Sequence, residues 1–261
     1  MRKVLSLSIF LILLFLESAV VSVGAQNYME VYRNNGNRIH LQVQDLDSIL
    51  FSNGGEFMGD HEYVDLGLSV KWATCNVGAN VPYEYGDYYA WGETETKNNY
   101  DWSTYKYCMG RDSTMTKYCN YSYGGYNGFI DNKTNLEPND DVAHVKWGGN
   151  WRMPTREDMN ELLDANNCKW VWKTSPVPGY KVTSLKEGYK DKYIFLPATG
   201  MITLDGGPYT DTGCYYWTSS LKSKSPSFVY ILIGMNYNGN NIYRCDEERR
   251  FPGLAVLPVC P

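Results

Sequence analysis

Residues 147–163 read Trp-Gly-Gly-Asn-Trp-Arg-Met-Pro-Thr-Arg-Glu-Asp-Met-Asn-Glu-Leu-Leu and contain the strongest secondary-structure signal in the chain. Thr155 can cap a helix, and Asp158 stands three residues later, where it completes a capping box. The apolar residues that follow share one helical face: Met159, Leu162 and Leu163. Asn166 and its neighbour can end the helix. The stretch therefore predicts one clear helix, entered from a turn rich in glycine and tryptophan.

The sequence on either side of this helix is built from short alternating segments bounded by turn residues. Such segments are typical of half-buried strands. We expect strands at 168–173, 180–183, 193–196, 215–219, 228–233 and 254–259. Between Trp91 and Trp147 the chain is polar and tyrosine-rich with little periodicity, and loops this long are usually functional surfaces or mobile insertions. These features predict an α+β fold with few helices, short antiparallel strands and long loops.

The first 25 residues are predicted to be a signal peptide. Arg2 and Lys3 are followed by 13 mostly apolar residues, and Val23 and Ala25 are suitable small residues before a cut at Gln26. The apolar run is shorter than the roughly 20 residues of a spanning helix. We expect an exported protein, periplasmic, cell-surface or secreted, without membrane insertion after cleavage. The alternative is an uncleaved N-terminal anchor.

The residues after the predicted cut form a small hairpin before the main domain. The segments 29–33 and 38–43 alternate on either side of Asn34-Asn35-Gly36-Asn37, a strong turn signal. We therefore divide the chain into a signal peptide at 1–25, a hairpin at 26–52, a linker at 53–61 and a main domain at 62–261. The hairpin would dock a partner, or it would pack on the main domain or on a neighbouring copy.

The composition excludes some classes of partner. The chain has 261 residues, of which 43% are apolar and 15% are aromatic. It contains 24 Lys and Arg against 29 Asp and Glu. That apolar content is enough for a core and excludes intrinsic disorder. A net charge of −5 without long basic runs argues against nucleic acid and anionic membranes as main partners.

Seven cysteines in an exported protein raise the question of disulfides. An odd count leaves at least one thiol unpaired. Cys108 and Cys119 follow the same Lys-Tyr pair and could close a loop. The alternative is that several cysteines are small buried apolar residues.

Four strings in the main domain carry a resemblance to a known family. They are Tyr-Val-Asp-Leu-Gly-Leu-Ser-Val-Lys-Trp-Ala at 63–73, Tyr-Gly-Asp-Tyr-Tyr-Ala-Trp-Gly-Glu at 85–93, Trp-Gly-Gly-Asn-Trp-Arg-Met-Pro-Thr at 147–155, and Tyr-Trp-Thr-Ser-Ser at 216–220. Together they resemble the Fibrobacter succinogenes major paralogous domain of exported Bacteroidetes proteins, over residues 62–260. The resemblance implies a C-type-lectin-like fold. One departure is Leu257, because the family usually has arginine at this position.

Residues 137–141 form a candidate calcium site. Glu137-Pro138-Asn139 matches the string with which mannose-type C-type lectins hold calcium and sugar hydroxyls, although the accompanying Trp-Asn-Asp is missing. Calcium takes six to eight oxygen ligands, and four residues here offer them: Glu137, Asn139, Asp140 and Asp141. The alternatives are a solvated acidic turn, or a structural calcium at Asp140 and Asp141.

The tyrosine-rich loop is the candidate ligand-binding surface. Its tyrosines alternate with Ser, Gly and Asn, a mixture typical of antibody binding loops. The residues expected to contact ligand are Tyr105, Tyr107, Tyr118, Tyr121, Tyr123 and Tyr126. The alternative is a loop folded back on its own rings. The tryptophans of the family strings are expected to serve packing: Trp72, Trp91, Trp147, Trp151 and Trp217.

Motifs for catalysis are lacking: the sequence has no G-x-S-x-G, H-E-x-x-H or phosphate-binding loop. Glu93 and Glu95, with Asp87 nearby, are the only suggestion of a glycosidase pair. We predict a non-enzymatic, exported binding or adhesion protein that recognises glycans or exposed proteins. The alternatives are a carbohydrate-active enzyme and a structural surface-assembly protein without a soluble ligand.

Overall fold

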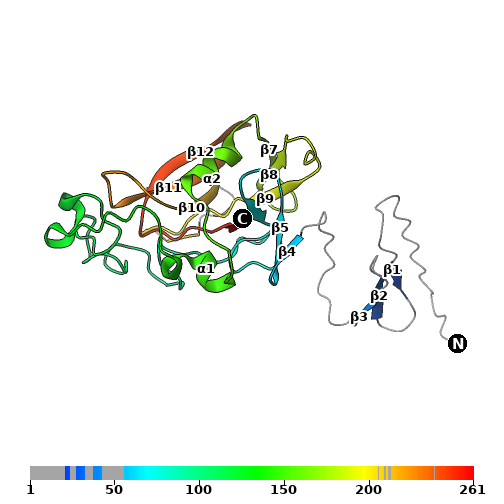
Figure 1. The fold of residues 1–261 in the computed structure, drawn as a ribbon, viewed down its shortest axis with the longest axis horizontal. Helices are drawn as coiled ribbons and strands as arrows, with labels where there is room; N and C mark the ends of the chain where they lie inside the picture. The colour runs from blue at the N-terminus through cyan, green and yellow to red at the C-terminus, as the bar shows by residue number, and fades with distance from the viewer. Residues whose placement is uncertain are drawn as a thin grey trace. The chain divides into compact units, whose positions relative to one another are not determined.

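The computed structural model describes residues 21–23, 28–32, 38–42, 56–204, 206–208, 210, 213–237 and 239–261. The chain divides into two units, Met1–Phe51 and Ser52–Pro261. Among the described residues, the second unit contains two short α-helices and three small sheets, in which all strand pairs are antiparallel (Figure 1). It is therefore an α+β unit with mainly β structure, as the sequence predicts.

The first unit contains a three-stranded antiparallel sheet. Its order is β1 (Val21–Val23), β2 (Tyr28–Tyr32) and β3 (Arg38–Gln42). The β2–β3 pair confirms the expected hairpin strands, with Tyr32 opposite Arg38. The turn at 33–37 lies outside the described residues. β1 falls inside the segment predicted to be removed on export.

The predicted linker at 53–61 is wrong in its second half. There β4 (Glu56–Met58) pairs with β5 (His61–Val64) in the same sheet as β6 (Lys71–Ala73) and β13 (Val259–Cys260). Backbone pairing therefore begins at Glu56. Residues 53–55 lie outside the described part of the chain.

The strand expected at 254–259 is mostly an irregular segment. Only β13 forms at its end, because successive residues bond to different partners. Leu254 bridges Tyr89, whereas Ala255 accepts a hydrogen bond from Trp217 N at 3.1 Å. The segment thus passes between neighbouring elements instead of joining one of them along its length.

The other two sheets contain the remaining predicted strands. One has the order β7 (Cys168–Lys173), β8 (Gly179–Ser184), β9 (Tyr193–Pro197); the other has β10 (Cys214–Leu221), β11 (Phe228–Tyr237), β12 (Asn240–Arg249). The sequence predicts parts or all of β7 to β11 but misses β12. β12 lies at a sheet edge and has no buried residue, so it lacks the apolar alternation that marks a strand.

The predicted helix is confirmed as α2 (Arg156–Leu163). Thr155 Oγ1 accepts a hydrogen bond from Asp158 N at 3.1 Å, and Asp158 Oδ2 accepts one from Thr155 N at 2.7 Å, so the capping box is complete. The other α-helix, α1 (Val142–Trp147), has only six residues and was not predicted. Within the described residues, no helix combines the length and apolar character that crossing a bilayer requires.

The second unit has two hydrophobic clusters. One surrounds Trp72 and Trp151 and includes the apolar face of α2, and the other surrounds Trp91 and Trp217. These four tryptophans are buried, and Trp147 is partly buried against both clusters, which confirms their packing role. Leu257 is buried in the first cluster. The green loops that precede α1 lie at the end of the unit away from sheet β7–β9 (Figure 1), whereas Tyr83, earlier in the segment between β6 and α1, packs on Phe195 of β9 with ring centroids 4.9 Å apart.

Candidate functional site

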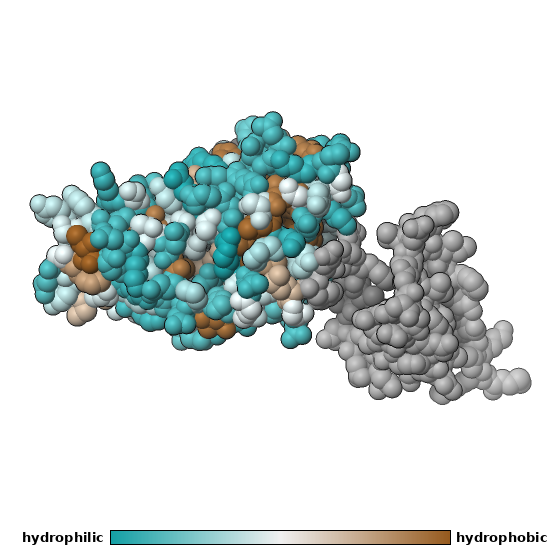
Figure 2. Space-filling model, viewed as in Figure 1, coloured by the Kyte–Doolittle hydropathy of each residue, from teal (hydrophilic) through white to brown (hydrophobic). Residues whose placement is uncertain are grey.

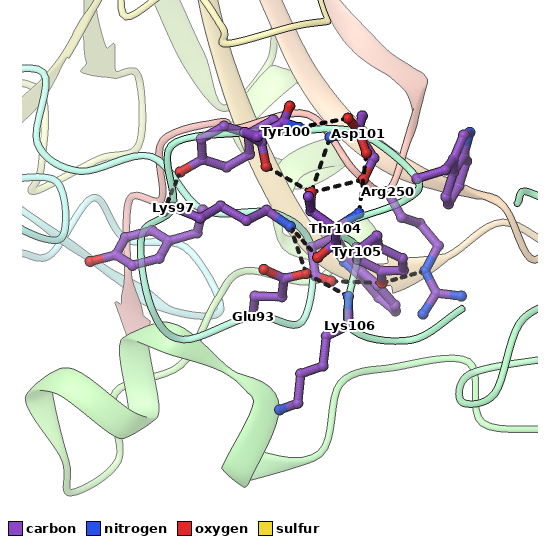
Figure 3. A network of polar contacts seen from close by, with 12 residues as sticks. Glu93, Lys97, Tyr100, Asp101, Thr104, Tyr105, Lys106 and Arg250 are labelled. Carbon is purple, nitrogen blue, oxygen red and sulfur yellow. Dashed lines mark hydrogen bonds and ion pairs between the residues drawn. The ribbon is translucent and has the colours of Figure 1, made fainter. Parts of the chain in front are cut away.

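The tyrosine-rich loop is fastened to the rest of the unit by a buried arginine. Arg250 directly follows β12 and is 0% exposed. Its Nε donates to Tyr105 Oη at 2.8 Å, its Nη1 to the Pro226 carbonyl at 2.9 Å and its Nη2 to the Lys117 carbonyl at 3.1 Å. Figure 3 shows the guanidinium beside the Tyr105 hydroxyl. One side chain therefore connects two points of the loop to the turn before β11.

The charge of Arg250 is accommodated without a carboxylate among the described residues. Its guanidinium carbon lies 4.8 Å from the Trp91 ring centroid, 5.1 Å from Tyr105 and 5.9 Å from Tyr118. Aromatic faces attract a cation, and the carbonyls accept its protons. An unpaired buried charge is otherwise costly, so these contacts tie the position of the loop to that of Arg250.

A buried carboxylate forms a second anchor in the same loop. Asp140 Oδ2 accepts hydrogen bonds from Lys117 Nζ and Tyr118 Oη, each at 2.5 Å, and Oδ1 accepts one from Tyr107 Oη. Burial by itself would raise the pKa of Asp140, but these donors outweigh it and lower that pKa. Burial and the neighbouring Asp140 raise the pKa of Tyr118 to about 12. At neutral pH the carboxylate is ionised and the phenols are protonated.

Tyr118 adopts an unusual backbone conformation at this anchor. Its φ is +57°, a region that bulky residues rarely occupy. Its N–H donates to Asp131 Oδ2 at 2.8 Å, and its hydroxyl also accepts from Glu137 N at 3.0 Å. Such a conformation persists where several contacts fix it. The loop is therefore held in one shape by its polar interior.

These contacts correct half of the predicted ligand-binding set. Tyr105, Tyr107 and Tyr118 are buried in the second cluster, between 0% and 7% exposed. Their rings pack edge to face in a row, with centroids 6.1 Å and 5.7 Å apart. They were expected to contact a ligand, but their hydroxyls already have buried partners. For these three residues the alternative, a loop folded on its own rings, is the correct one.

The other half of the set lies at the surface. We call the exposed group Tyr121, Tyr123, Tyr126, Phe129 and Ile130 the aromatic tip; its side chains are 37% to 81% exposed. The Tyr121 and Tyr123 rings lie 5.4 Å apart at 47°. Figure 2 shows hydrophobic atoms at the end of the second unit that the tyrosine-rich loop forms. Aromatic side chains thus face solvent here next to aliphatic ones.

The backbone of the aromatic tip is bonded to a buried residue. Met115, which is 0% exposed, donates its N–H to Gly124 O at 2.8 Å and accepts from Tyr126 N at 2.9 Å. At Gly125 a Cβ would lie 1.9 Å from the Phe129 carbonyl oxygen, so only glycine fits. The tip is therefore an ordered turn supported from beneath, although its side chains are exposed.

The candidate calcium site is not formed. The Glu137 carboxylate is bound by Lys133 Nζ at 2.6 Å and by Lys117 Nζ at 2.7 Å. Asp140 is held by Lys117 and two tyrosines, and Asn139 is exposed without a described side-chain contact. Ammonium groups stand where a calcium site would need open oxygens.

Asp141, the fourth expected ligand, has a structural role. Its Oδ1 accepts from His144 N at 3.1 Å and caps α1, and its Oδ2 accepts from Met153 N at 2.8 Å. Burial raises the pKa of this carboxyl. Over the described residues, no group of three or more His, Cys, Asp or Glu is placed to hold a metal. The acidic turn is therefore neither solvated throughout nor arranged as a calcium cage.

The carboxylates considered for catalysis also have partners. Glu93 accepts from Lys97 Nζ at 2.9 Å and from Lys106 N at 2.8 Å, as Figure 3 shows. Glu95 pairs with Lys146 at 2.8 Å. The Asp87 carboxylate accepts the Tyr89 hydroxyl at 3.1 Å. Each carboxylate is thus bonded to a lysine, a backbone N–H or a tyrosine hydroxyl.

All seven cysteines are free thiols, and the possible disulfide between Cys108 and Cys119 is not formed. Cys108 Sγ donates to the Trp102 carbonyl at 3.2 Å, and Cys119 Sγ donates to the Tyr121 carbonyl at 3.2 Å. Burial raises the pKa of both thiols. The alternative, that several cysteines are small buried residues, is confirmed for four of them: Cys119, Cys168, Cys214 and Cys260.

Comparison of the chain with family models, with curated proteins and with solved structures gave no significant match.

Proposed function

We propose that this is a non-enzymatic, exported binding protein with a C-type-lectin-like domain, and that it contacts glycans or exposed proteins through the aromatic tip. The observation that carries the proposal is the contrast between an exposed aromatic surface and the buried polar anchors beneath it. Tyr123 is 81% exposed, whereas Met115 and Tyr118 below it are 0% exposed. The few helices, small antiparallel sheets and long loops are consistent with the proposed fold.

A rigid base benefits binding because less conformational freedom is lost when a partner docks. The Arg250 and Asp140 anchors supply that base. Tyrosine provides a large amphipathic contact surface with few rotatable bonds, and the tip intersperses it with Ser, Gly and Asn. An aromatic ring can stack on the apolar face of a sugar or pack on an exposed protein side chain.

The test is a glycan array probed with the chain beginning at Gln26, in calcium and again in chelator. We expect binding that chelator does not remove, because the carboxylates of residues 137–141 are bound by lysine, tyrosine and backbone groups. Tyr123→Ala should abolish it. Tyr237→Ala is the matched control, since Tyr237 is 70% exposed on β11, outside the tip.

The partner class follows from a second measurement. If the array is empty, binding to intact cells before and after protease treatment identifies a protein partner. Equal binding by the Tyr123→Ala and Tyr237→Ala proteins would exclude the aromatic tip as the contact surface. Binding that requires calcium would contradict the assignment of residues 137–141 as structural.

A further inference from the structure

A second candidate site lies apart from the aromatic tip. It is a pocket of about 490 Å³ whose lining includes Leu136, Asp141, Asn150, Arg152, Thr155 and Ser219. That volume is within the range of roughly 300–1,000 Å³ typical of small-molecule pockets. Two of the sequence strings that suggested the family, at 147–155 and 216–220, meet here. No residue of the aromatic tip lines the pocket.

Ser219 of β10 lines this pocket, and its hydroxyl has no hydrogen-bond partner among the described residues. The residue is 6% exposed, and its backbone is fully engaged: Ser219 N donates to Pro154 O at 2.8 Å and its carbonyl accepts from Leu136 N at 3.0 Å. Within the described part of the chain its Oγ has no hydrogen bond, and the oxygen keeps some solvent exposure. A polar group that is nearly buried but open to a pocket suits a ligand hydroxyl.

The neighbouring Ser220, unlike Ser219, has hydrogen-bond partners for its hydroxyl. Ser220 Oγ donates to Asn135 Oδ1 at 2.8 Å and accepts from Arg156 N at 3.1 Å. Its hydrogen-bonding capacity is used within the protein. The Asn135 amide nitrogen, by contrast, has no partner among the described residues and also lines the pocket. The Ser219 hydroxyl and the Asn135 amide nitrogen therefore remain as donors for a ligand, beside the hydrogen bond between Ser220 and Asn135 Oδ1.

Arg152 supplies a cationic edge in the same pocket. Its Nη1 donates to Asp158 Oδ2 at 2.7 Å and to the Met153 carbonyl at 3.0 Å, which fixes the guanidinium plane. Over the described residues, Nε and Nη2 have no partner. These two nitrogens form the side of a guanidinium that binds a carboxylate through two parallel hydrogen bonds. The arginine is thus held in place on one side and open on the other.

The remaining lining limits the class of ligand further. Leu136, Pro138 and Met153 provide apolar surface, and the exposed Asn150 amide has no described partner. Asp141 also lines the pocket, but both of its oxygens accept backbone N–H groups. A ligand that fits all these features has one carboxylate, several hydroxyls and an apolar face.

We propose that this pocket binds a hexuronic acid, with its carboxylate on Arg152 Nε and Nη2 and a ring hydroxyl on Ser219 Oγ. The acidic groups nearby are Asp141, which lines the pocket together with His144, and Asp158, whose Oδ2 accepts from Arg152 Nη1 at 2.7 Å. Both Asp141 oxygens already accept backbone N–H groups, and Arg152 supplies the positive charge that a ligand carboxylate needs. This site needs no metal and is independent of the aromatic tip.

The test is isothermal titration of the purified chain with galacturonate as the probe, and with galactose as its neutral counterpart. We expect saturable binding of galacturonate and at least tenfold weaker binding of galactose, since the galactose lacks the group that Arg152 would hold. Ser219→Ala should weaken galacturonate binding about tenfold, the worth of one good hydrogen bond. Because the Ser219 hydroxyl has no partner among the residues that the structure describes, this variant should keep the stability of the parent.

Two further variants make the result decisive. Arg152→Lys keeps the charge but loses the fork, and should weaken galacturonate binding at least tenfold. Asn160→Ala on α2 is the control, because Asn160 is exposed and does not line the pocket; it should bind as the parent does. Equal affinity for galactose, no binding of millimolar galacturonate, or unchanged binding by Ser219→Ala would each overturn the proposal.

The tip and the pocket can fail separately. Tyr123→Ala should bind galacturonate like the parent, even though it is expected to lose the glycan or protein partner of the tip. Conversely, Ser219→Ala should keep tip binding. Loss of galacturonate binding in Tyr123→Ala would mean that the two surfaces are one site, which contradicts the present assignment.

Discussion

Tyr118 and Tyr123 stand five residues apart in a loop of uniform composition, yet one is 0% exposed and the other is 81% exposed. The difference lies in their hydrogen-bonding partners. The Tyr118 hydroxyl reaches the buried Asp140 carboxylate, while Tyr123 has no described hydrogen bond through its hydroxyl. A tyrosine is buried here where a charged group in the interior can satisfy its hydroxyl. From the composition of the loop alone, both tyrosines would be predicted to lie at the surface.

The contrast between the buried base and the exposed tip is tested most severely at Arg250. Arg250→Met leaves at least three carbonyls without their donor: those of Lys117, Tyr118 and Pro226. We expect the free energy of unfolding, measured with urea, to fall by about 3 kcal/mol or more. The free energy of unfolding of Arg250→Lys should lie between those of the parent and of Arg250→Met, because one ammonium cannot reach every acceptor.

Arg249→Met is the matched control for this change. Arg249 is the adjacent residue but is exposed at the end of β12. Its substitution should change the free energy of unfolding by less than about 0.5 kcal/mol. If the two methionine variants unfold at the same urea concentration, the buried guanidinium does not hold the loop.

A smaller effect is expected from removing single hydroxyls. Tyr118→Phe removes the hydrogen bond to Asp140 and the acceptor for Glu137 N. Because one partner is charged, the cost should be about 2 kcal/mol of unfolding free energy. Tyr123→Phe should cost less than about 0.5 kcal/mol. Chemical denaturation of both variants measures the difference, and equal values would remove the distinction between base and tip.

The smallest effect is a change in the pH dependence of stability. The donors around Asp140 lower its folded-state pKa below the unfolded value of about 3.9. Its contribution is therefore complete above pH 4 and is lost as the pH falls toward the folded-state pKa. Asp140→Asn should flatten the loss of stability below pH 4, measured by urea titrations at several pH values. The exposed Asp112→Asn should leave the slope of the parent unchanged.

The sequence predicts best where a local pattern and the tertiary contacts agree. The capping box of Thr155 and Asp158 defined α2, and the alternation at 168–173 defined β7. β12 was missed because its residues are intermediate or exposed. The roles of Asp140 and Asp141 were missed because the acidic residues alone do not show whether they form an ion site or a structural anchor. Their donors decide this, and the lysine and one of the backbone donors come from other parts of the sequence.

Arg250 was missed for a related physical reason. It sits in the run Glu-Glu-Arg-Arg at 247–250, which reads as a solvated surface. The sequence around it does not distinguish Arg250 from the exposed Arg249. The difference comes from its contacts with aromatic rings and carbonyls of residues 91 to 118 and with the Pro226 carbonyl. The pocket was missed likewise, since Arg152 and Ser219 meet only in three dimensions.

The contacts of Arg250 also set the order in which the chain can fold. They join residues 132 to 145 positions apart, to Tyr105, Met115, Lys117 and Tyr118. Loop closure over such separations is slow compared with helix or hairpin formation. A chain emerging from the ribosome acquires Arg250 only after it has been extended by 132 residues beyond Tyr118. The surface proposed to meet the partner can therefore reach its final shape only after this late residue has been made.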